Sequence, residues 1–354
     1  MTDTIQRNEK KLNKVLIIRL SSIGDILLTT PLIRVLHQTY PDCRIDFVIK
    51  RQFQDLIAYH PYISKVYAFD KHDPATSLVN LKTQIRNEHY DVVIDIHKNF
   101  RSIYLRTCVN ADRVVQFKKY ALKRWLLVHF KINLYDTVVP VYRRYIDSIK
   151  DFGFKYDDAG LELFIPDHTE RLVERDWGER LRSMSGPIIG MAPGASYLTK
   201  RWLPDGFGEV AEYLIRRYNA RIIFFGNADD REVIGGIIDS LECDRTCVYN
   251  IAGKLSLMES ASLLNRCCCL ITNDTGLMHM ATALKKKVIA IFGSTTRELG
   301  FFPCSDEAII VQHADLKCRP CSHVGRNSCP EKHFRCMRDI TASHVIDAYE
   351  SLKL

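Results

Sequence analysis

The 354-residue sequence contains no apolar run as long as the ~20 residues that a membrane-spanning helix needs. Its first segment, Met1–Asn13, is polar and mixed in charge, and it lacks the apolar core of a secretory signal peptide. The turn after the apolar run at 221–226 lacks the glycine-rich pattern of dinucleotide-binding dehydrogenases, and we find no recognised nucleic-acid-binding motif. These absences predict a cytoplasmic protein that is neither a Rossmann dehydrogenase nor a nucleic-acid binder.

Cysteine is not scarce, but the twelve cysteines do not indicate a secreted disulfide scaffold. Such scaffolds are short and secreted, whereas this chain is long and shows no secretory signal. Three consecutive cysteines, Cys267–Cys269, lie within an apolar stretch, where we expect them to behave as small core residues. Disulfide bonds are therefore not expected to define the fold.

The net charge is +8, from 50 Lys and Arg residues against 42 Asp and Glu residues. Much of the excess lies between Arg101 and Arg144. Basic and aromatic residues alternate there: Lys118, Lys119, Lys123, Arg124 and Lys131 with Tyr120, Trp125 and Phe130. The pattern is typical of a solvated helix face with aromatic anchors, and also of a patch for an anionic acceptor or an acidic membrane surface.

Short apolar runs alternate with helix-periodic segments along the chain, which predicts an α/β protein with parallel sheets. The length of the chain favours two domains, each with its own set of strands. The expected strands are 14–19, 44–49, 66–69, 91–95 and 114–117 in the first set, and 188–191, 221–226, 246–250, 269–272, 288–292 and 308–311 in the second.

Each domain is expected to be a doubly wound, Rossmann-like unit. A linker at 153–166 separates an N-terminal domain at 1–160 from a C-terminal domain at 161–342. The last helix, at about 343–354, could pack back on the first domain. Ligands bind beyond the carboxyl ends of the strands in open α/β sheets, so we expect the two sheets to face a central cleft.

Gly24 and Asp25 follow the first strand. Gly24 permits a tight turn, and Asp25 falls at a helix N-terminus, where free N–H groups favour an ionised carboxylate. Two interpretations stay open for Asp25. It is either a helix cap or a general base that faces the cleft.

A second turn, Pro193–Ser196, follows the first strand of the second domain and leads to Thr199, Lys200 and Arg201. Small residues and hydroxyls beside a Lys-Arg pair suit an anionic phosphate. The alternative is an ordinary loop with solvated charges.

Two further turns carry carboxylates. Asp274, Thr275 and Gly276 open a helix, and His279 falls near the end of its first turn. With the Lys200 loop they suit a sugar diphosphate, although a helix cap and a buried histidine would look the same. The turn at 226–232 places acidic side chains beyond another strand, where a carboxylate binds ribose hydroxyls or caps the next helix.

These motifs, in this order, resemble those of glycosyltransferase family 9, the heptosyltransferases that build the inner core of lipopolysaccharide. The resemblance extends over about residues 14 to 350. The matching residues are Leu20–Asp25 with Pro31, Pro193–Ser196, Lys200–Trp202 with Pro204, Asp274–Gly276 with His279 and Ala281, and Phe292–Gly293. Each piece alone is a weak signal, but the linked set is specific to the family. The resemblance implies the two-domain GT-B architecture.

The resemblance also implies roles for individual residues. Asp25 would deprotonate the acceptor hydroxyl, and Lys200 would hold the donor diphosphate. The other donor-binding residues would be Ser196, Thr199, Thr275 and Gly276 at the diphosphate, Glu232 at the ribose, Leu255 near the adenine, and Asp274 with His279 at the sugar. The family transfers heptose from ADP-heptose with inversion and needs no catalytic metal. A carboxylate activates the nucleophile, and cationic groups stabilise the leaving diphosphate.

Near its end the chain departs from the best-known members of the family. Cys318, Cys321, Cys329 and Cys336 form a C-x2-C-x7-C-x6-C pattern, with His323 and His333 interspersed. A compact four-cysteine group in a cytoplasmic protein favours a structural Zn or Fe ion over disulfide bonds. The spacing differs from that of a standard zinc finger, so unliganded thiols and conditional disulfides stay open.

The sequence thus predicts an inverting glycosyltransferase that uses ADP-heptose and a lipid A–Kdo type of acceptor. It would act in the cytoplasm, with peripheral contact to the inner face of the inner membrane as a further option. Two alternatives stay open: an enzyme of the same fold that uses another nucleotide sugar, and a non-catalytic nucleotide-sugar-binding protein. The presence of both Asp25 and Lys200 argues against the second.

Overall fold

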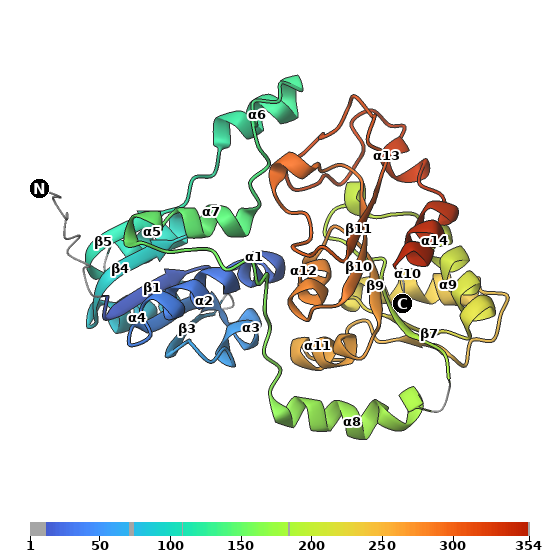
Figure 1. The fold of residues 1–354 in the computed structure, drawn as a ribbon, viewed down its shortest axis with the longest axis horizontal. Coiled ribbons are helices and arrows are strands. Elements are labelled where there is room, and N and C mark those ends of the chain that lie inside the picture. Colours follow the sequence, from blue (N-terminus) through green and yellow to red (C-terminus); the bar gives the residue numbers. More distant parts are fainter. Residues whose placement is uncertain (1–11, 71–73, 108, 183–184, 353–354) are drawn as a thin grey trace, which may run out of the picture. The chain divides into compact units, whose positions relative to one another are not determined.

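The computed structural model describes residues 12–70, 74–107, 109–182 and 185–352. The chain divides into two compact units (Figure 1). The first unit comprises residues 1–118 and 142–159, and the second comprises residues 119–141 and 160–354.

The first unit is built on a five-stranded parallel sheet in the order β3-β2-β1-β4-β5. Its strands are β1 (Lys14–Ile18), β2 (Arg44–Lys50), β3 (Lys65–Phe69), β4 (His89–Asp95) and β5 (Asn110–Gln116). Its helices are α1 (Ile23–Leu27), α2 (Thr30–Thr39), α3 (Asp55–Ala58), α4 (Pro74–Arg86), α5 (Phe100–Arg106) and α7 (Val141–Asp147), with 3-10 segments at Arg51–Phe53 and Lys150–Phe152. β1 is central because the apolar side chains of residues 15–18 are buried on both faces of the sheet.

The second unit contains a six-stranded parallel sheet in the order β11-β10-β9-β6-β7-β8. Its strands are β6 (Ile188–Ala192), β7 (Arg221–Phe224), β8 (Val248–Asn250), β9 (Cys269–Asn273), β10 (Lys287–Phe292) and β11 (Ala308–Gln312). Its helices are α6 (Ala121–Phe130), α8 (Asp167–Arg182), α9 (Pro204–Tyr218), α10 (Arg231–Asp239), α11 (Leu257–Asn265), α12 (Gly276–Ala283), α13 (Arg335–Arg338) and α14 (Ala342–Ser351), with 3-10 segments at Leu198–Lys200, Ala228–Asp230 and Arg297–Leu299.

In both sheets the strand order reverses beside the first strand of the unit. The reversal lies between β1 and β4 in the first sheet and between β6 and β9 in the second. At such a point the loops that follow the two strands run in opposite directions and leave a crevice for a ligand. The loops after β1, β6 and β9 are those that carry the sequence motifs. The predicted pair of doubly wound parallel-sheet units is confirmed.

Two expectations about the domains need correction. Residues 119–141 belong to the second unit, not to the N-terminal domain, because Lys131 donates to the carbonyl of Pro320 and Val141 N–H donates to that of Gly300. The C-terminal helix α14 also belongs to the second unit. Its buried stripe, which includes Val345 and Tyr349, lies in the core of that unit beside α9. Residues 353–354 of the expected helix lie outside the described residues.

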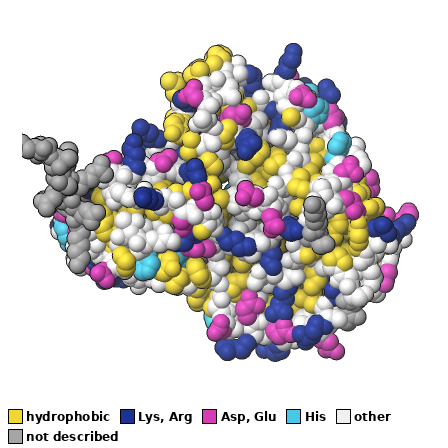
Figure 2. Space-filling view, in the orientation of Figure 1, with side chains coloured by type: hydrophobic (Ala, Val, Ile, Leu, Met, Phe, Trp, Pro, Cys, Tyr) yellow, Lys and Arg dark blue, Asp and Glu magenta, His cyan; other side chains and the backbone are white. Residues whose placement is uncertain are grey.

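Within the described part of the chain, no helix is both long and apolar enough to cross a bilayer. On the face drawn in Figure 2, Lys and Arg side chains are interspersed with Asp and Glu. That face carries no broad basic surface of the kind that binds a nucleic-acid backbone.

Candidate functional site

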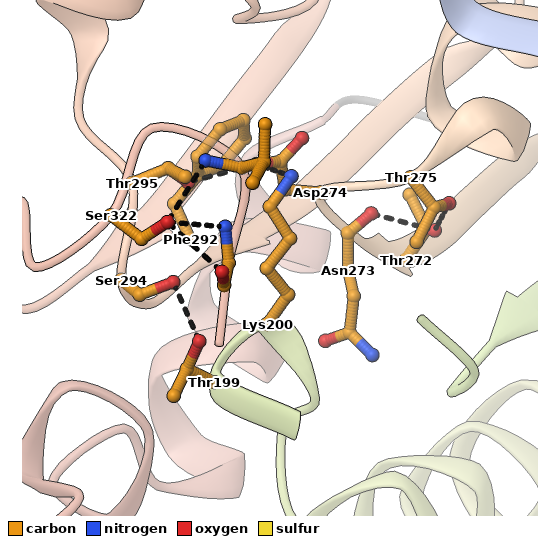
Figure 3. A network of polar contacts seen from close by, with 12 residues as sticks. Thr199, Lys200, Thr272, Asn273, Asp274, Thr275, Phe292, Ser294, Thr295 and Ser322 are labelled. Carbon is orange, nitrogen blue, oxygen red and sulfur yellow. Dashed lines mark hydrogen bonds and ion pairs between the residues drawn. The ribbon is translucent and has the colours of Figure 1, made fainter. Parts of the chain in front are cut away.

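The carboxyl ends of β6 and β9 lie side by side at the reversal point of the second sheet. The loop after β6 leads into the 3-10 segment Leu198–Lys200, and Asp274 follows β9 directly. The Lys200 Nζ lies 2.7 Å from the Asp274 carboxylate (Figure 3), and the two side chains are only 16% and 5% exposed. A largely desolvated ion pair therefore stands where open α/β sheets bind their ligands.

A third loop completes the surroundings of Asp274. Thr295, which follows β10, donates its hydroxyl hydrogen to the same carboxylate oxygen at 2.8 Å. Asp274 is thus fixed by residues from the loops after β6 and β10. An ammonium and a carboxylate held side by side can bind an anionic group and a hydroxyl group of one ligand.

The N-terminus of α12 follows Asp274 in the sequence. Thr275 is the N-cap residue, in an extended conformation with φ −140°, and its side chain makes no capping hydrogen bond. Thr275 and Gly276 are half-buried. The N–H groups of the first turn and the helix dipole favour an anion here, and Lys200 adds a positive charge. His279 lies further along α12 and is 4% exposed.

Thr199 connects the loop after β6 to the loop after β10. It is 1% exposed, and its hydroxyl donates to Ser294 Oγ at 3.0 Å while accepting from the Arg326 N–H at 2.8 Å. The Ser294 N–H donates to the Thr199 carbonyl at 3.2 Å. Gly293 allows this approach, because a Cβ there would stand 2.8 Å from the Thr199 carbonyl oxygen. The structure therefore differs from the prediction that the Thr199 hydroxyl binds the diphosphate: this hydroxyl is buried, and both of its hydrogen bonds are made with protein groups.

The turn after β6 is shaped by a second glycine. A Cβ on Gly194 would stand 2.3 Å from the Asp230 carboxylate, which accepts a hydrogen bond from the Asn227 N–H at 3.0 Å. Asp230 is therefore the buried partner of the N-cap residue Asn227 in the capping box of the 3-10 segment at Ala228–Asp230. Ser196, two residues beyond Gly194, is exposed.

The turns after β7 and β8 come together at the same edge of the sheet. The Gly253 N–H donates to the Gly226 carbonyl at 3.1 Å, and the Arg231 guanidinium donates to the Ala252 carbonyl at 3.3 Å. Glu232, in the first turn of α10, is exposed, and Leu255, just before α11, is half-buried. The structure therefore brings Glu232 and Leu255 to neighbouring loops.

Asp25 lies in the first unit, in α1. One carboxylate oxygen lies 2.6 Å from the Arg19 guanidinium, and the other accepts hydrogen bonds from the Ser22 N–H and hydroxyl at 3.3 and 3.1 Å. Burial acts to raise the pKa of Asp25, but the Arg19 charge and the Ser22 hydrogen bonds outweigh it and hold this pKa below its usual range. Arg19 is itself anchored to the Ile96 carbonyl at 2.7 Å.

Arg19 could not be identified from the sequence, because it reads as the basic end of a strand. The sequence also gives no sign of the support that the cysteine-rich segment (residues 316–338) gives to the site. Arg319 donates to the carbonyl of Thr295 at 2.8 Å, and the Cys321 N–H donates to that of Ser294 at 3.2 Å. Together with the bond from the Arg326 N–H to Thr199, these contacts tie the segment to two of the loops around Asp274. No local sequence pattern signals such long-range bonds.

The four cysteines of this segment are neighbours. Burial raises the pKa of the Cys336 thiol to about 12, and the charges of Cys321, Cys329 and Cys318 add to that rise. Cys318 Sγ lies 3.9 Å from His333 Nε2. Thiolate and imidazole are the donors that Zn and Fe prefer, so the residues present fit such an ion chemically. Their ligand atoms are not drawn together into a four-ligand cage.

Only one set of three closely spaced His, Cys, Asp or Glu ligand atoms occurs among the described residues, and it is a different one. His89, Asp91 and Asp112 bring such atoms within 4.8 Å of one another. They belong to the amino-terminal halves of β4 and β5, far along the strands from the edge that carries the motifs. Asp91 already accepts the Asn13 and Lys14 N–H groups, which gives it a structural role.

Residues 78–333 match the family model of glycosyltransferase family 9 (heptosyltransferase). The chain is similar to lipooligosaccharide heptosyltransferase 2 of Haemophilus influenzae, with 30% identity over 311 residues that cover 84% of this chain and 88% of the relative.

Solved structures share the fold. A glycosyl transferase family 9 protein from Veillonella parvula superposes with a TM-score of 0.80 at 24% identity, covering 96% of this chain and 97% of the other. The ADP-heptose lps heptosyltransferase II of E. coli gives a TM-score of 0.70 at 22% identity, covering 96% and 98%. The iron-containing dodecameric glycosyltransferase TibC of enterotoxigenic E. coli gives 0.59 at 16% identity, covering 97% and 79%.

Proposed function

The chain belongs to glycosyltransferase family 9, and on that premise we propose that it transfers heptose from ADP-heptose, with inversion, to the inner core of lipopolysaccharide. The predicted family, the GT-B architecture and the assignment as a glycosyltransferase are confirmed. The main evidence for the site is the Lys200–Asp274 ion pair, which lies at the reversal point of the second sheet, beside the N-terminus of α12.

In this proposal the second unit holds the donor. Lys200 and the first-turn N–H groups at Thr275 and Gly276 receive the diphosphate and stabilise the charge that develops as it leaves. Asp274 exchanges part of its pairing with Lys200 for hydroxyls of the heptose. The remaining assignments are Ser196 at the diphosphate, Thr199 as the buried support of Lys200, Glu232 at the ribose, Leu255 at the adenine and His279 near the sugar.

Asp25 of the first unit acts as the base. It takes the proton from the acceptor hydroxyl, whose oxygen attacks the anomeric carbon of heptose opposite the departing ADP, so the configuration inverts. Since the pKa of Asp25 is held below its usual range by Arg19 and Ser22, the carboxylate is ionised and ready to accept a proton at neutral pH. It is a weak base in the ground state, and its effect arises as the hydroxyl becomes acidic during bond formation. Transfer requires both units, because the base and the donor groups belong to different ones.

The acceptor we propose is of the lipid A–Kdo type, met in the cytoplasm at the inner face of the inner membrane. The four cysteines Cys318, Cys321, Cys329 and Cys336 would hold a structural Zn or Fe ion. Such an ion would order the cysteine-rich segment and, through it, the loops around Asp274. No step of the transfer depends on a metal, since Lys200 and the helix N-terminus supply the positive charge.

A donor screen tests this proposal. Thermal unfolding is followed with ADP-heptose, ADP-glucose, UDP-glucose and ADP alone, because a ligand that binds the native state raises the unfolding temperature. We expect the largest rise with ADP-heptose, and a largest rise with another nucleotide sugar would point to the alternative donor. Release of ADP from ADP-heptose only when a lipid A–Kdo acceptor is present separates an enzyme from a non-catalytic binding protein.

A further inference from the structure

Helix α6 exposes an apolar face that no other described residue of the second unit covers. With 3.6 residues per turn, Leu122, Trp125, Leu126 and Phe130 fall on one side of the helix. Leu122 is 68% exposed, Trp125 49% and Phe130 58%. In Figure 2, hydrophobic side chains gather where Figure 1 draws α6. Large apolar side chains clustered on one exposed face mark an interaction site, unlike the same residues scattered singly.

The helix is held firmly from its other side. Leu127 and Val128 are 5% and 8% exposed. Lys131, in a left-handed conformation with φ 60°, ends the helix and donates to the carbonyls of Val128 and Pro320 at 2.7 and 2.8 Å. The exposed face is therefore presented by an anchored element.

The segment that carries this face is strongly basic. Residues 118–141 contain five Lys and Arg residues against a single acidic one, Asp136. Asp136 is already engaged by Lys123 at 3.4 Å. Lys118, before the helix, is exposed, and so is Lys131 after it. Protein–protein interfaces are depleted in Lys, whereas helices that lie on anionic bilayers combine Trp, Phe and Leu with flanking Lys and Arg.

We propose that α6 docks the protein on an anionic lipid bilayer. Leu122, Trp125 and Phe130 enter the boundary between headgroups and acyl chains, while Lys118 and Lys119 meet the lipid phosphates. The inference deepens the proposed function, because a sugar acceptor carried on lipid A has to be met at such a surface. Docking itself needs neither donor nor turnover, so it can be tested separately.

The first test is co-sedimentation of the full chain with vesicles. Vesicles of phosphatidylethanolamine and phosphatidylglycerol should bind the protein, phosphatidylcholine vesicles should bind it much less, and added salt should weaken binding. The triple variant Leu122→Ser, Trp125→Ser, Phe130→Ser should bind at least about tenfold more weakly, since three apolar side chains no longer leave water. The control Val79→Ser, Leu172→Ser changes exposed apolar residues elsewhere and should bind like the wild type.

A charge variant tests the same surface independently, in case the triple variant misfolds. Lys118→Glu, Lys119→Glu should also reduce binding at least about tenfold, because each basic residue near an anionic surface strengthens the attraction to it. Lys150→Glu, Lys155→Glu makes the same change in net charge at exposed positions of the first unit and should have little effect. Tryptophan emission gives an independent readout. In a Trp177→Phe background, anionic vesicles should shift the emission to the blue, and Trp125→Phe should abolish the shift.

Activity on two acceptors separates this proposal from the proposed function. The triple variant should keep wild-type turnover with a delipidated, water-soluble acceptor and lose it with an acceptor embedded in vesicles. Vesicle binding that ignores lipid charge, or that survives in both α6 variants, would overturn the docking role. So would the absence of binding together with a dimer, seen by light scattering, that the triple variant converts to monomer, because the face would then be covered by a second copy.

Discussion

The guanidinium of Arg19 lies 2.6 Å from the carboxylate of Asp25, and it is anchored to the carbonyl of Ile96 at 2.7 Å. Arg19 leaves the end of β1, Ile96 follows β4, and Asp25 lies in the helix after β1. The pair therefore bridges the reversal point of the first sheet. The arginine keeps the proposed base ionised, and at the same time it lowers the basicity of that carboxylate.

The first prediction concerns Asp25 itself. Asp25→Asn should still fold, but its free energy of unfolding at neutral pH should be lower than that of the wild type, because the buried Arg19 guanidinium loses its carboxylate partner. Its transfer rate should fall ~10²–10⁴-fold, the usual loss for a general base. Steady-state kinetics with thermal unfolding measure both. Asp55→Asn, at the start of α3, is the matched control, and near-wild-type turnover by folded Asp25→Asn would remove Asp25 from the reaction.

The second prediction concerns the pH dependence that Arg19 imposes. Because the pKa of Asp25 in the folded protein is lowered by Arg19, the rate should stay high as pH falls and decline only below the usual carboxylate range. Arg19→Met removes the positive charge that offsets the effect of burial on Asp25. The pKa of Asp25 should therefore rise, and the acid limb of kcat/KM should move to higher pH. An unchanged acid limb in a folded Arg19→Met enzyme would show that another group sets it.

The same pair gives a prediction for stability, with the sign fixed by the lowered pKa. The ion pair stabilises the folded chain above the pKa that Asp25 has in the unfolded chain, and this contribution is lost as pH falls through the lower folded pKa. The difference in unfolding free energy between the wild type and Asp25→Asn should therefore shrink from neutral to acidic pH. Denaturant titrations at several pH values measure it, and a difference that grows on acidification would contradict the account.

Lys200 supplies the fourth prediction. Lys200→Ala should reduce kcat/KM for the donor ~10²–10³-fold, as expected when a group that stabilises developing charge is removed. Lys200→Arg should lose less, because it keeps the charge and loses only the compact geometry that pairs with Asp274. Lys155→Ala, an exposed lysine of the first unit, is the control. Equal losses in the two Lys200 variants would mean that charge is not what the residue provides.

The fifth prediction addresses the cysteine-rich segment. Purified without added metal or an affinity tag, the protein should contain about one equivalent of Zn or Fe, as one ion per four ligands requires. Cys321→Ser should lower the metal content and the unfolding temperature together, while Cys243→Ser, outside the segment, should change neither. Donor affinity of the folded fraction should persist, because the bond from the Cys321 N–H to the Ser294 carbonyl is a backbone bond. Metal-free protein with unchanged stability would leave thiol packing or disulfides as the alternatives.

The sequence predicted the elements that carry a local signal. The apolar runs at 14–19 and 269–272 are strands because buried parallel strands have few polar residues, and the turns after them contain Asp25 and Asp274. Parallel strands align their carboxyl ends, so a pattern in the sequence was enough to place Lys200 and Asp274 at one edge. Their direct pairing could not be predicted, since it depends on side-chain positions 74 residues apart in sequence (274 − 200).

Other elements and supporting residues could not be predicted from the sequence, for physical reasons. Helix α8 was missed because its 16 residues are mostly charged, and it is held by long-range pairs such as Glu170 with Ser262 at 2.9 Å. The C-terminal helix was assigned to the wrong unit because its apolar stripe shows that it is buried without showing against what. Arg319 and Thr199 support the loops around Asp274 through long-range hydrogen bonds, which leave no periodic trace in the sequence.

Mass spectrometry of the acceptor measures the proposed heptose transfer itself. The wild type is incubated with ADP-heptose and a lipid A–Kdo acceptor, and ADP is quantified in parallel. We expect the acceptor to gain one heptose residue for each ADP released, and we expect Asp25→Asn and Lys200→Ala to form little of this product. An acceptor of unchanged mass after ADP-heptose has been consumed, or equal product from wild type and Asp25→Asn, would contradict it.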